Sequence, residues 1–197
     1  MWIKICGMTT AAAVEAALET RVDAIGFVFA PSVRELTPGA AAALARPARG
    51  KLPCVAVTHH PGQKAVDEIV RVFGPDLLQS DAEDFAALRL PDSLGTLAVV
   101  REGAAIPAPL PARILYEGPA SGRGRQTDWN AAGALAGSTE LVLAGGLNEA
   151  NVAAAIAAVH PFGVDVSSGV EERPGVKSPA AIMRFVAAVR AAAAAPI

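Results

Sequence analysis

Residues 162–171 read FGVDVSSGVE, and this stretch indicates the architecture of the chain. The apolar run 163–166 carries a single acid, Asp165, and predicts a buried strand. It leads into Ser167, Ser168 and Gly169, whose small side chains leave the backbone N–H groups uncovered. An apolar-periodic helix is expected from Pro179. A strand, a small-residue turn and a helix can together bind an oxyanion, because the N–H groups of the turn converge on it.

The preceding segment repeats this arrangement. Residues 140–144 (ELVLA) predict a strand, Gly145 and Gly146 follow it, and a helix is expected from Asn148. Two adjacent strand–turn–helix units near the C-terminal end are the usual phosphate site of a β/α barrel. The alternative is that these glycines only form tight turns between strand and helix. We favour phosphate binding, because the two turns occur together.

Strands and helices alternate along the whole chain. Strands are predicted at residues 2–6, 23–29, 52–57, 76–79, 96–100, 113–117, 140–144 and 163–166. Helices are predicted at residues 10–18, 39–44, 63–73, 82–90 and 129–135, and from residues 148 and 179. Residues 101–111 hold three prolines, so the helix after the fifth strand is expected to be missing or a single turn. Eight alternations favour one short (β/α)8 TIM barrel over residues 1–197, with an open doubly wound sheet as the alternative.

Composition excludes several classes of protein. The 197 residues are 52% hydrophobic and carry a formal net charge of -2 without a basic block, so nucleic acid is not an expected partner. No apolar run reaches the length of a membrane span. The first strand begins at Trp2, which leaves no room for a signal peptide. The two cysteines do not form a spaced framework, so a reduced, cytoplasmic protein is expected.

Three chemically useful residues fall in or at the ends of predicted strands. Cys6 ends the first strand, Glu117 ends the sixth, and Asp165 lies in the eighth. In a barrel these positions meet at the C-terminal face, where a cysteine and a carboxylate can act as base and acid. Cys6 could instead be a small buried hydrophobic residue, as we expect for Cys54. Glu117 is expected to be functional, because an unpaired acid in an apolar strand end is costly.

Other polar residues carry weaker signals. Arg34, in the loop after the second strand, is either a solvated surface residue or a fork for a substrate carboxylate. His59, His60 and His160 show no metal-ligand spacing to acids or cysteines, so no metal site is expected. Asp128 is expected to cap a helix.

Five segments resemble one enzyme family, phosphoribosylanthranilate isomerase of tryptophan biosynthesis. The matching segments, in family order, are KICGMT (4–9), GFVFAPSVR (26–34), TDW (127–129), LAGGLNEANV (143–152) and GVDVSSGVEERPGVKS (163–178). The resemblance implies a (β/α)8 barrel without metal or organic cofactor. It also implies an Amadori rearrangement of N-(5-phosphoribosyl)anthranilate to the corresponding carboxyphenylamino-deoxyribulose phosphate.

The resemblance also implies roles for individual residues. Cys6 falls on the general base, Arg34 on the arginine that holds the anthranilate carboxylate, and Asp165 on an acid close to the reacting sugar. The two phosphate-binding turns correspond to Gly145 and Gly146, and to Ser168 and Gly169. Barrels of the family occur as monomers and homodimers, and the sequence does not choose between them.

Three positions depart from the family pattern. The general acid that ends strand six is usually an aspartate, and here it is Glu117. Gln-Leu-His-Gly near strand four is replaced by residues 79–82 (QSDA), and an asparagine after strand three is replaced by Thr58. Two alternatives therefore stay open: a related aminoaldose phosphosugar isomerase of histidine biosynthesis, and a non-catalytic phosphosugar-binding barrel. Asp128 is the second candidate for the general acid.

Overall fold

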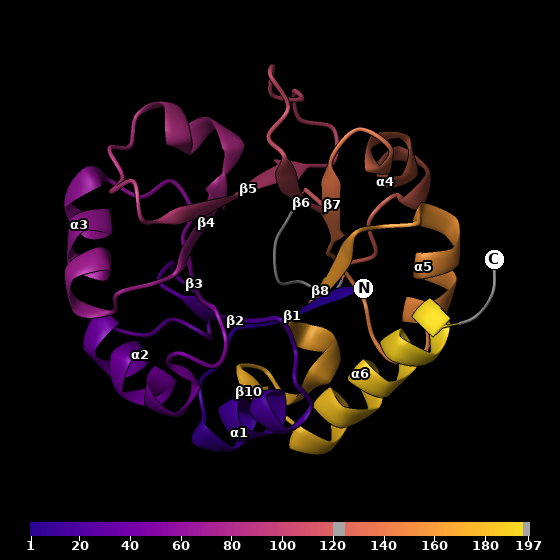
Figure 1. Cartoon of the computed structure of the whole chain (residues 1–197), viewed down its shortest axis with the longest axis horizontal. Helices are drawn as coiled ribbons and strands as arrows, with labels where there is room; N and C mark the ends of the chain where they lie inside the picture. The colour runs from indigo at the N-terminus through magenta and orange to yellow at the C-terminus, as the bar shows by residue number, and fades with distance from the viewer. Residues whose placement is uncertain (120–124, 195–197) are drawn as a thin grey trace.

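The computed structural model describes residues 1–119 and 125–194 and shows a closed barrel of eight parallel strands (Figure 1). Each strand pairs with its neighbours in chain order, and β8 pairs with β1 to close the barrel. The strands are β1 (Trp2–Cys6), β2 (Ala24–Val28), β3 (Cys54–Val57), β4 (Leu77–Asp81), β5 (Gly95–Arg101), β6 (Arg113–Glu117), β7 (Glu140–Leu143) and β8 (Gly163–Val166). The predicted (β/α)8 barrel is confirmed.

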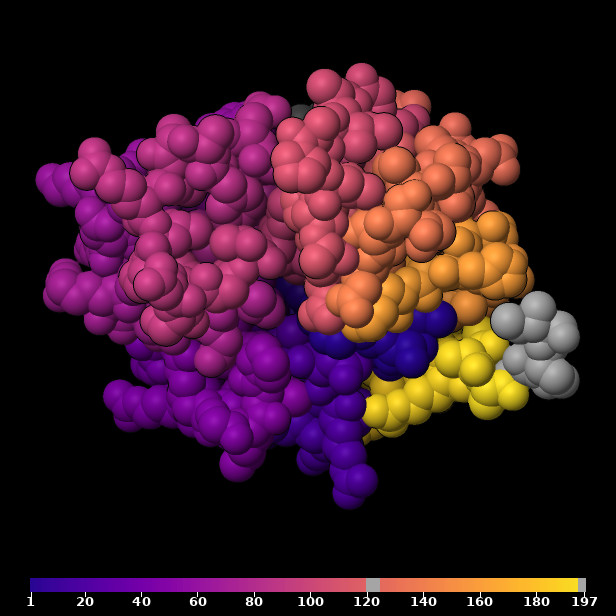
Figure 2. All heavy atoms as spheres, turned by 45° about the horizontal axis from the view of Figure 1, so that its top comes forward, coloured from indigo at the N-terminus to yellow at the C-terminus, as the bar shows by residue number. Residues whose placement is uncertain are grey.

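Helices form a ring around the strands (Figure 1). The α-helices are α1 (Ala11–Glu19), α2 (Pro38–Ala45), α3 (Gln63–Val72), α4 (Trp129–Ala136), α5 (Val152–Val159) and α6 (Pro179–Ala194), and the short 3₁₀ helices are η1 (Arg46–Ala48), η2 (Ala82–Ala86) and η3 (Ser168–Val170). In space-filling form the outer surface runs from purple segments on the left of the view to orange and yellow segments on the right (Figure 2). None of the described helices is long and apolar enough to cross a membrane.

Two of the segments that connect successive strands contain less helix than the other connecting segments. The α-helix predicted at residues 82–90 is wrong, since only η2 forms there. The side chain of Gln63 accepts a hydrogen bond from the N–H of Arg89 and donates one to its C=O, so this backbone pairs with α3 instead of a helix of its own. Between β5 and β6 the structure has no helix, as its three prolines predict.

The start of α5 lies later than predicted, at Val152 instead of Asn148. The Asn148 side chain accepts hydrogen bonds from the N–H groups of Ala150 and Asn151, and the Asn151 side-chain oxygen accepts one from the N–H of Asn148. Asn151 also donates to the C=O of Gly146. This exchange makes a turn that fixes the end of the preceding loop before the helix begins.

The barrel interior has room for polar groups beside β1. Lys4 and Cys6 of β1 pair in register with Ala24 and Gly26 of β2. A Cβ on Gly26 would lie 3.1 Å from the Cys6 sulfur and 3.3 Å from Cε of Lys4. Glycine at this position therefore provides the space that lets both side chains lie inside the barrel.

A two-stranded antiparallel hairpin follows β8 and was not predicted from the sequence. It consists of β9 (Glu171–Arg173) and β10 (Val176–Lys177). Its turn contacts two other loops: the Thr9 hydroxyl donates to the C=O of Gly175, and a Cβ on Gly175 would lie 2.5 Å from the C=O of Val33. The hairpin thereby brings Glu171 and Lys177 to the loops after β1 and β2.

Candidate active site

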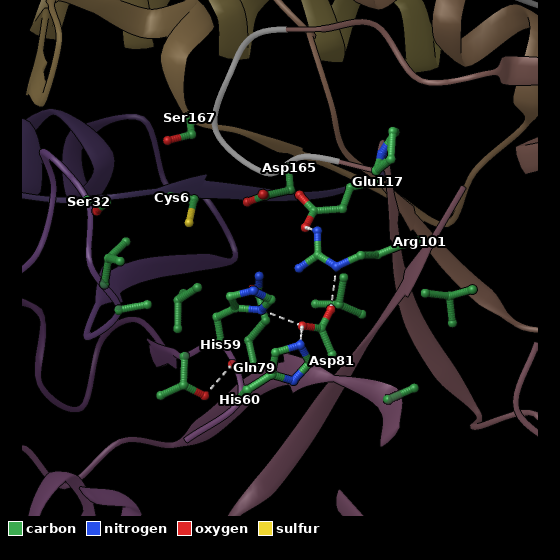
Figure 3. Close-up of a pocket in the computed structure, with 18 of the residues that line it drawn as sticks. Cys6, Ser32, His59, His60, Gln79, Asp81, Arg101, Glu117, Asp165 and Ser167 are labelled. Atoms are coloured by element: carbon green, nitrogen blue, oxygen red, sulfur yellow. Dashed lines mark hydrogen bonds and ion pairs between the residues drawn. The ribbon is translucent and has the colours of Figure 1, made fainter. Parts of the chain in front are cut away.

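A cavity of about 600 Å³ opens at the C-terminal ends of the strands. Four predicted site residues line it: Cys6 from β1, Arg34 from the loop after β2, Glu117 from β6 and Asp165 from β8. Figure 3 shows Cys6, Asp165 and Glu117 side by side along one wall. The structure thus brings together the base, acid and carboxylate-binding candidates, although they are spread over more than 150 residues.

A second, smaller cavity of about 40 Å³ adjoins the first. It is lined by Gly145, Gly146 and Ser168, which are three of the four predicted phosphate-binding residues. Glu117 and Asp165 line both cavities, so the glycine-rich turns lie directly beside the acid candidates. This arrangement suits a ligand with an anionic group at one end and its reacting atoms a short distance away.

The turn after β7 requires glycine at both positions. Gly145 and Gly146 have φ values of 92° and 67°, and a Cβ on Gly145 would lie 2.1 Å from the Thr127 hydroxyl. That hydroxyl donates to the C=O of Ala144 and is buried under the turn. Gly169 does not line either cavity; a Cβ there would lie 1.9 Å from the C=O of Leu147. Glycine at position 169 therefore permits the loops after β7 and β8, which are the two candidate phosphate-binding loops, to lie in contact.

Lys4 and Asp165 form a buried ion pair that the sequence did not reveal. Lys4 is fully buried, and its Nζ donates to Oδ1 of Asp165 at 2.8 Å. Burial alone would lower the pKa of Lys4, but the charge of Asp165 and the nearby Cys6 raise it above its ordinary value. Lys4 therefore stays charged and holds the Asp165 carboxylate in place beside Cys6.

Cys6 is a thiol in a polar, buried setting. Burial raises the pKa of Cys6 above its ordinary value, and the neighbouring charge of Asp165 acts in the same direction. Lys4 and Lys177 act against this by favouring the thiolate. By contrast, Cys54 lies in β3 and burial is the main cause that raises its pKa to about 11. Cys54 is a core residue, as expected.

Arg34 and Lys177 both contact the carboxylate of Glu171. Arg34 donates from Nε to Oε1 at 2.6 Å and from Nη2 to Oε2 at 2.9 Å, and Lys177 donates to Oε1 at 2.7 Å. Lys177 is also buried, and it donates further to the C=O and hydroxyl of Ser167. Arg34 is thus a fixed, nearly buried residue rather than a solvated one.

Glu117 has a charged partner, which corrects the expectation that it is unpaired. Arg101 at the end of β5 donates from Nη1 to Oε1 of Glu117 at 2.8 Å and from Nε to Oδ1 of Asp81 at 2.6 Å (Figure 3). Burial alone would lower the pKa of Arg101, but these two carboxylates raise it above its ordinary value. Two of the departures from the family pattern, Glu117 and Asp81, therefore share one guanidinium.

Asp128 lies outside both cavities. Its side chain accepts hydrogen bonds from the N–H groups of Asn130 and Ala131, so it is the N-cap of α4, as predicted.

The histidines after β3 have acidic partners that the spacing of residues along the sequence did not reveal. Nδ1 of His59 lies 2.6 Å from Oδ2 of Asp81, and Nδ1 of His60 lies 2.8 Å from Oδ1 of Asp84. The hydrogen bond to Asp84 raises the pKa of His60 above its ordinary value. The acids come from β4 and η2, about 22 residues further along the chain, a separation that short-range spacing does not detect.

The remaining departure, Thr58, and the nearby Gln79, which keeps the family residue, also line the main cavity. Thr58, which replaces the family asparagine, lines the cavity, and its hydroxyl donates to the C=O of Gln79. The side chain of Gln79 lines the same cavity, and among the described residues its buried Oε1 has no hydrogen-bond partner. A bound ligand with an N–H or O–H group could satisfy this oxygen.

The fold and these cavities define a (β/α)8-barrel enzyme whose candidate acid and base meet at the C-terminal ends of the strands. The family model for N-(5'phosphoribosyl)anthranilate (PRA) isomerase matches residues 3–188. The N-(5'-phosphoribosyl)anthranilate isomerase of Rhizobium etli (strain CIAT 652) is 39% identical, over 96% of this chain and 94% of the relative. The chain belongs to the phosphoribosylanthranilate isomerase family.

Solved structures agree with this assignment. The TrpF structure from Jonesia denitrificans is 36% identical with a TM-score of 0.81, covering 98% of each chain. A phosphoribosyl anthranilate isomerase in complex with reduced 1-(o-carboxyphenylamino)-1-deoxyribulose 5-phosphate is 26% identical with a TM-score of 0.80, covering 97% of this chain and 99% of that chain.

Proposed function

We infer that the chain is a phosphoribosylanthranilate isomerase that acts in tryptophan biosynthesis. It converts N-(5'-phosphoribosyl)anthranilate to 1-(2-carboxyphenylamino)-1-deoxyribulose 5-phosphate. The observation that carries this inference is the meeting of Cys6, Arg34, Glu117 and Asp165 in one cavity beside the glycine turns. The family match supports it over an aminoaldose isomerase of histidine biosynthesis.

We propose that Glu117 is the general acid. It protonates the furanose ring oxygen while the bond from C1 to that oxygen breaks, and the lone pair of the anthranilate nitrogen forms a C1=N double bond. In this role Glu117 carries a proton before ring opening, while its Oε1 accepts the hydrogen bond from Nη1 of Arg101. The substrate brings a phosphate and a carboxylate, and nearby negative charge favours the neutral form of a carboxyl group.

Cys6 is the proposed general base. Its thiolate removes the proton from C2, and the electrons of that bond move to form a C1=C2 double bond while the iminium nitrogen is neutralised. Tautomerisation then gives the C2 ketone and returns a proton to C1, so the reaction needs no external oxidant. Lys4 and Lys177 favour the thiolate, and Asp165, held by Lys4, lies where it can accept a hydrogen bond from a sugar hydroxyl.

Substrate binding is proposed to use both ends of the site. Arg34 holds the anthranilate carboxylate by charge-assisted hydrogen bonds. Gly145, Gly146 and Ser168 hold the phosphate with their turns, and Gly169 keeps the two turns in contact. No metal or organic cofactor takes part in this proposal.

The remaining expectations from the sequence stay proposals. We propose that residues 1–197 form one domain, that the protein is cytoplasmic, and that it is a monomer or a homodimer with no nucleic-acid or membrane partner. Light scattering of the purified protein would separate monomer from dimer.

The activity is tested by a coupled assay with purified protein and freshly generated N-(5'-phosphoribosyl)anthranilate. We expect turnover with this substrate and none with the aminoaldose phosphate of histidine biosynthesis. If the protein binds the reduced product analogue but shows no turnover, it is the non-catalytic binding barrel and the proposed acid–base roles are wrong.

A further inference from the structure

We propose that His59, His60 and Asp81 form a binding site for a divalent transition metal, with Zn²⁺ as the probe, at the rim of the main cavity. Their ligating atoms all lie within 4.8 Å of one another. Oδ2 of Asp81 lies 2.6 Å from Nδ1 of His59 and 3.7 Å from Nε2 of His60. Two imidazoles and one carboxylate form a common catalytic or surface ligand set for zinc.

The spacing of these atoms suits tetrahedral coordination with small adjustments. Metal–ligand bonds of about 2.0 Å place two ligand atoms of a tetrahedron about 3.3 Å apart. The separation of His60 and Asp81 is close to this value, while that of His59 and Asp81 must widen by less than about 1 Å. Both histidine side chains are about half exposed, so the metal has an entry path, and binding replaces the contact between His59 and Asp81.

His60 has the supporting contact that metal-bound histidines usually have. Oδ1 of Asp84 lies 2.8 Å from Nδ1 of His60, while Oδ2 of Asp84 accepts from the N–H of His60 and from the Ser80 hydroxyl. A carboxylate on one ring nitrogen fixes the proton there and leaves the other nitrogen, Nε2, as the metal ligand. The backbone of His60 has a φ of 47°, and Nε2 of its ring lies 3.7 Å from Oδ2 of Asp81.

Asp81 supplies the charge of the site. It is buried and accepts from Arg101 with Oδ1, which keeps Oδ2 directed to the histidines (Figure 3). Since all three ligand residues line the main cavity, the remaining coordination positions are open to water. The proposal does not depend on the proposed isomerase activity.

The test is titration of metal-free protein with Zn²⁺ by calorimetry, with Co²⁺ absorption as a second readout of coordination. We expect one ion per chain. His60→Asn keeps a residue that tolerates positive φ but removes the Nε2 ligand, and it should weaken binding at least about tenfold. Asp84→Asn should cost about 10–100-fold through the orientation of His60.

His160→Asn is the matched control, because His160 is also exposed and also has a positive φ, of 51°. It should bind Zn²⁺ as wild type does, and so should Cys6→Ala. Equal affinity of wild type and His60→Asn would overturn the proposal, as would the absence of binding by wild type. Loss of binding in Cys6→Ala with retention in His60→Asn would place the metal at the thiol and also overturn it.

Discussion

Arg34 and Glu171 form a two-point ion pair across 137 residues of sequence, with Nε 2.6 Å from Oε1 and Nη2 2.9 Å from Oε2. The pair fixes the guanidinium at the wall of the main cavity. A guanidinium has five N–H donors, so this arrangement leaves Nη1 able to donate to a ligand. The residue predicted to bind a carboxylate thus already holds one, and that carboxylate orients it.

Replacing Arg34 by alanine should weaken binding of the reduced product analogue by roughly 2 kcal/mol or more, about 30-fold, because a charge-assisted pair with its carboxylate is lost. Calorimetry measures this change. Thermal protection by inorganic phosphate should persist, since the turns at Gly146 and Ser168 are unchanged. Equal loss of phosphate protection would place Arg34 at the phosphate instead.

Alanine in place of Cys6 should lower kcat by at least about a hundredfold with little change in binding of the product analogue, because the base is removed. Cys54→Ala is the matched control and should keep its turnover. If Cys6→Ala turns over almost normally while Cys54→Ala does not, the assignment of the base is wrong.

The protonation state of Cys6 can be tested separately by alkylation. Because burial raises the pKa of Cys6, the thiolate that acts as the base is the minor form at neutral pH, and the rate of iodoacetamide labelling should rise about tenfold per pH unit until the pKa is reached. The product analogue should protect Cys6. Labelling at pH 7 as fast as that of a thiolate with a lowered pKa would show that Cys6 rests in its ionised form.

Glu117→Gln should nearly abolish isomerisation, because it keeps the shape of the side chain but removes the acidic proton. Glu117→Asp should keep measurable activity. Asp128→Asn should keep activity with a small loss of stability, since asparagine caps α4 nearly as well as aspartate. Measuring kcat for the three variants together identifies the general acid. An inactive Asp128→Asn variant beside an active Glu117→Gln variant would assign the role of general acid to Asp128.

Loss of the Arg101 guanidinium should destabilise the protein and lower kcat. Arg101→Ala removes a shared partner from Glu117 and from the buried Asp81, which we expect to cost about 2–4 kcal/mol of unfolding free energy. Adding Asp81→Asn to this variant should recover part of the loss, because one of the two charges is then gone. Denaturant unfolding of the four proteins gives the coupling; strictly additive effects would show that the network is not energetically coupled.

Glu171 should make the protein sensitive to acid. Burial alone would raise its pKa, but hydrogen bonds from Arg34 and Lys177 hold the pKa below its ordinary value of 4.5. The unfolded state therefore binds this proton more tightly, so the stabilisation is present above about pH 4.5 and is lost as pH falls through the folded pKa. In Glu171→Gln the Tm should start lower and should fall less between about pH 5 and pH 3. An equally steep fall in the variant would contradict this assignment.

Local patterns in the sequence predicted the strands of the barrel well. Apolar runs located all eight strands, and Cys6, Glu117 and Asp165 lie in or at the ends of strands as predicted. These signals suffice because every strand of a parallel barrel is buried on both faces. The helix predicted at residues 82–90 does not form beyond η2, because a distant side chain, Gln63, takes up the backbone groups of Arg89.

The partners of the site residues could not be predicted in the same way. Lys4 and Lys177 lie in the quoted segments 4–9 and 163–178. Because lysine is rarely buried, the sequence around each lysine does not indicate that it pairs with an acid on another element. Arg101 lies sixteen residues from Glu117 and twenty from Asp81. The pairing of β5 with its neighbours β4 and β6 brings these three residues together, and Arg101 pairs in register with Glu117.

The ion pair between Lys4 and Asp165 joins the first strand to the last, and so does the β1–β8 pairing. A ribosome therefore releases most of the chain before any complete site can exist. A fragment that stops before Gly163 contains Cys6, Arg34 and Glu117, yet it leaves the buried ammonium of Lys4 without its counter-ion and Arg34 without Glu171. Such long-range contacts are slow to form. Catalytic competence and completion of the barrel should consequently arise together, so incomplete chains are inactive.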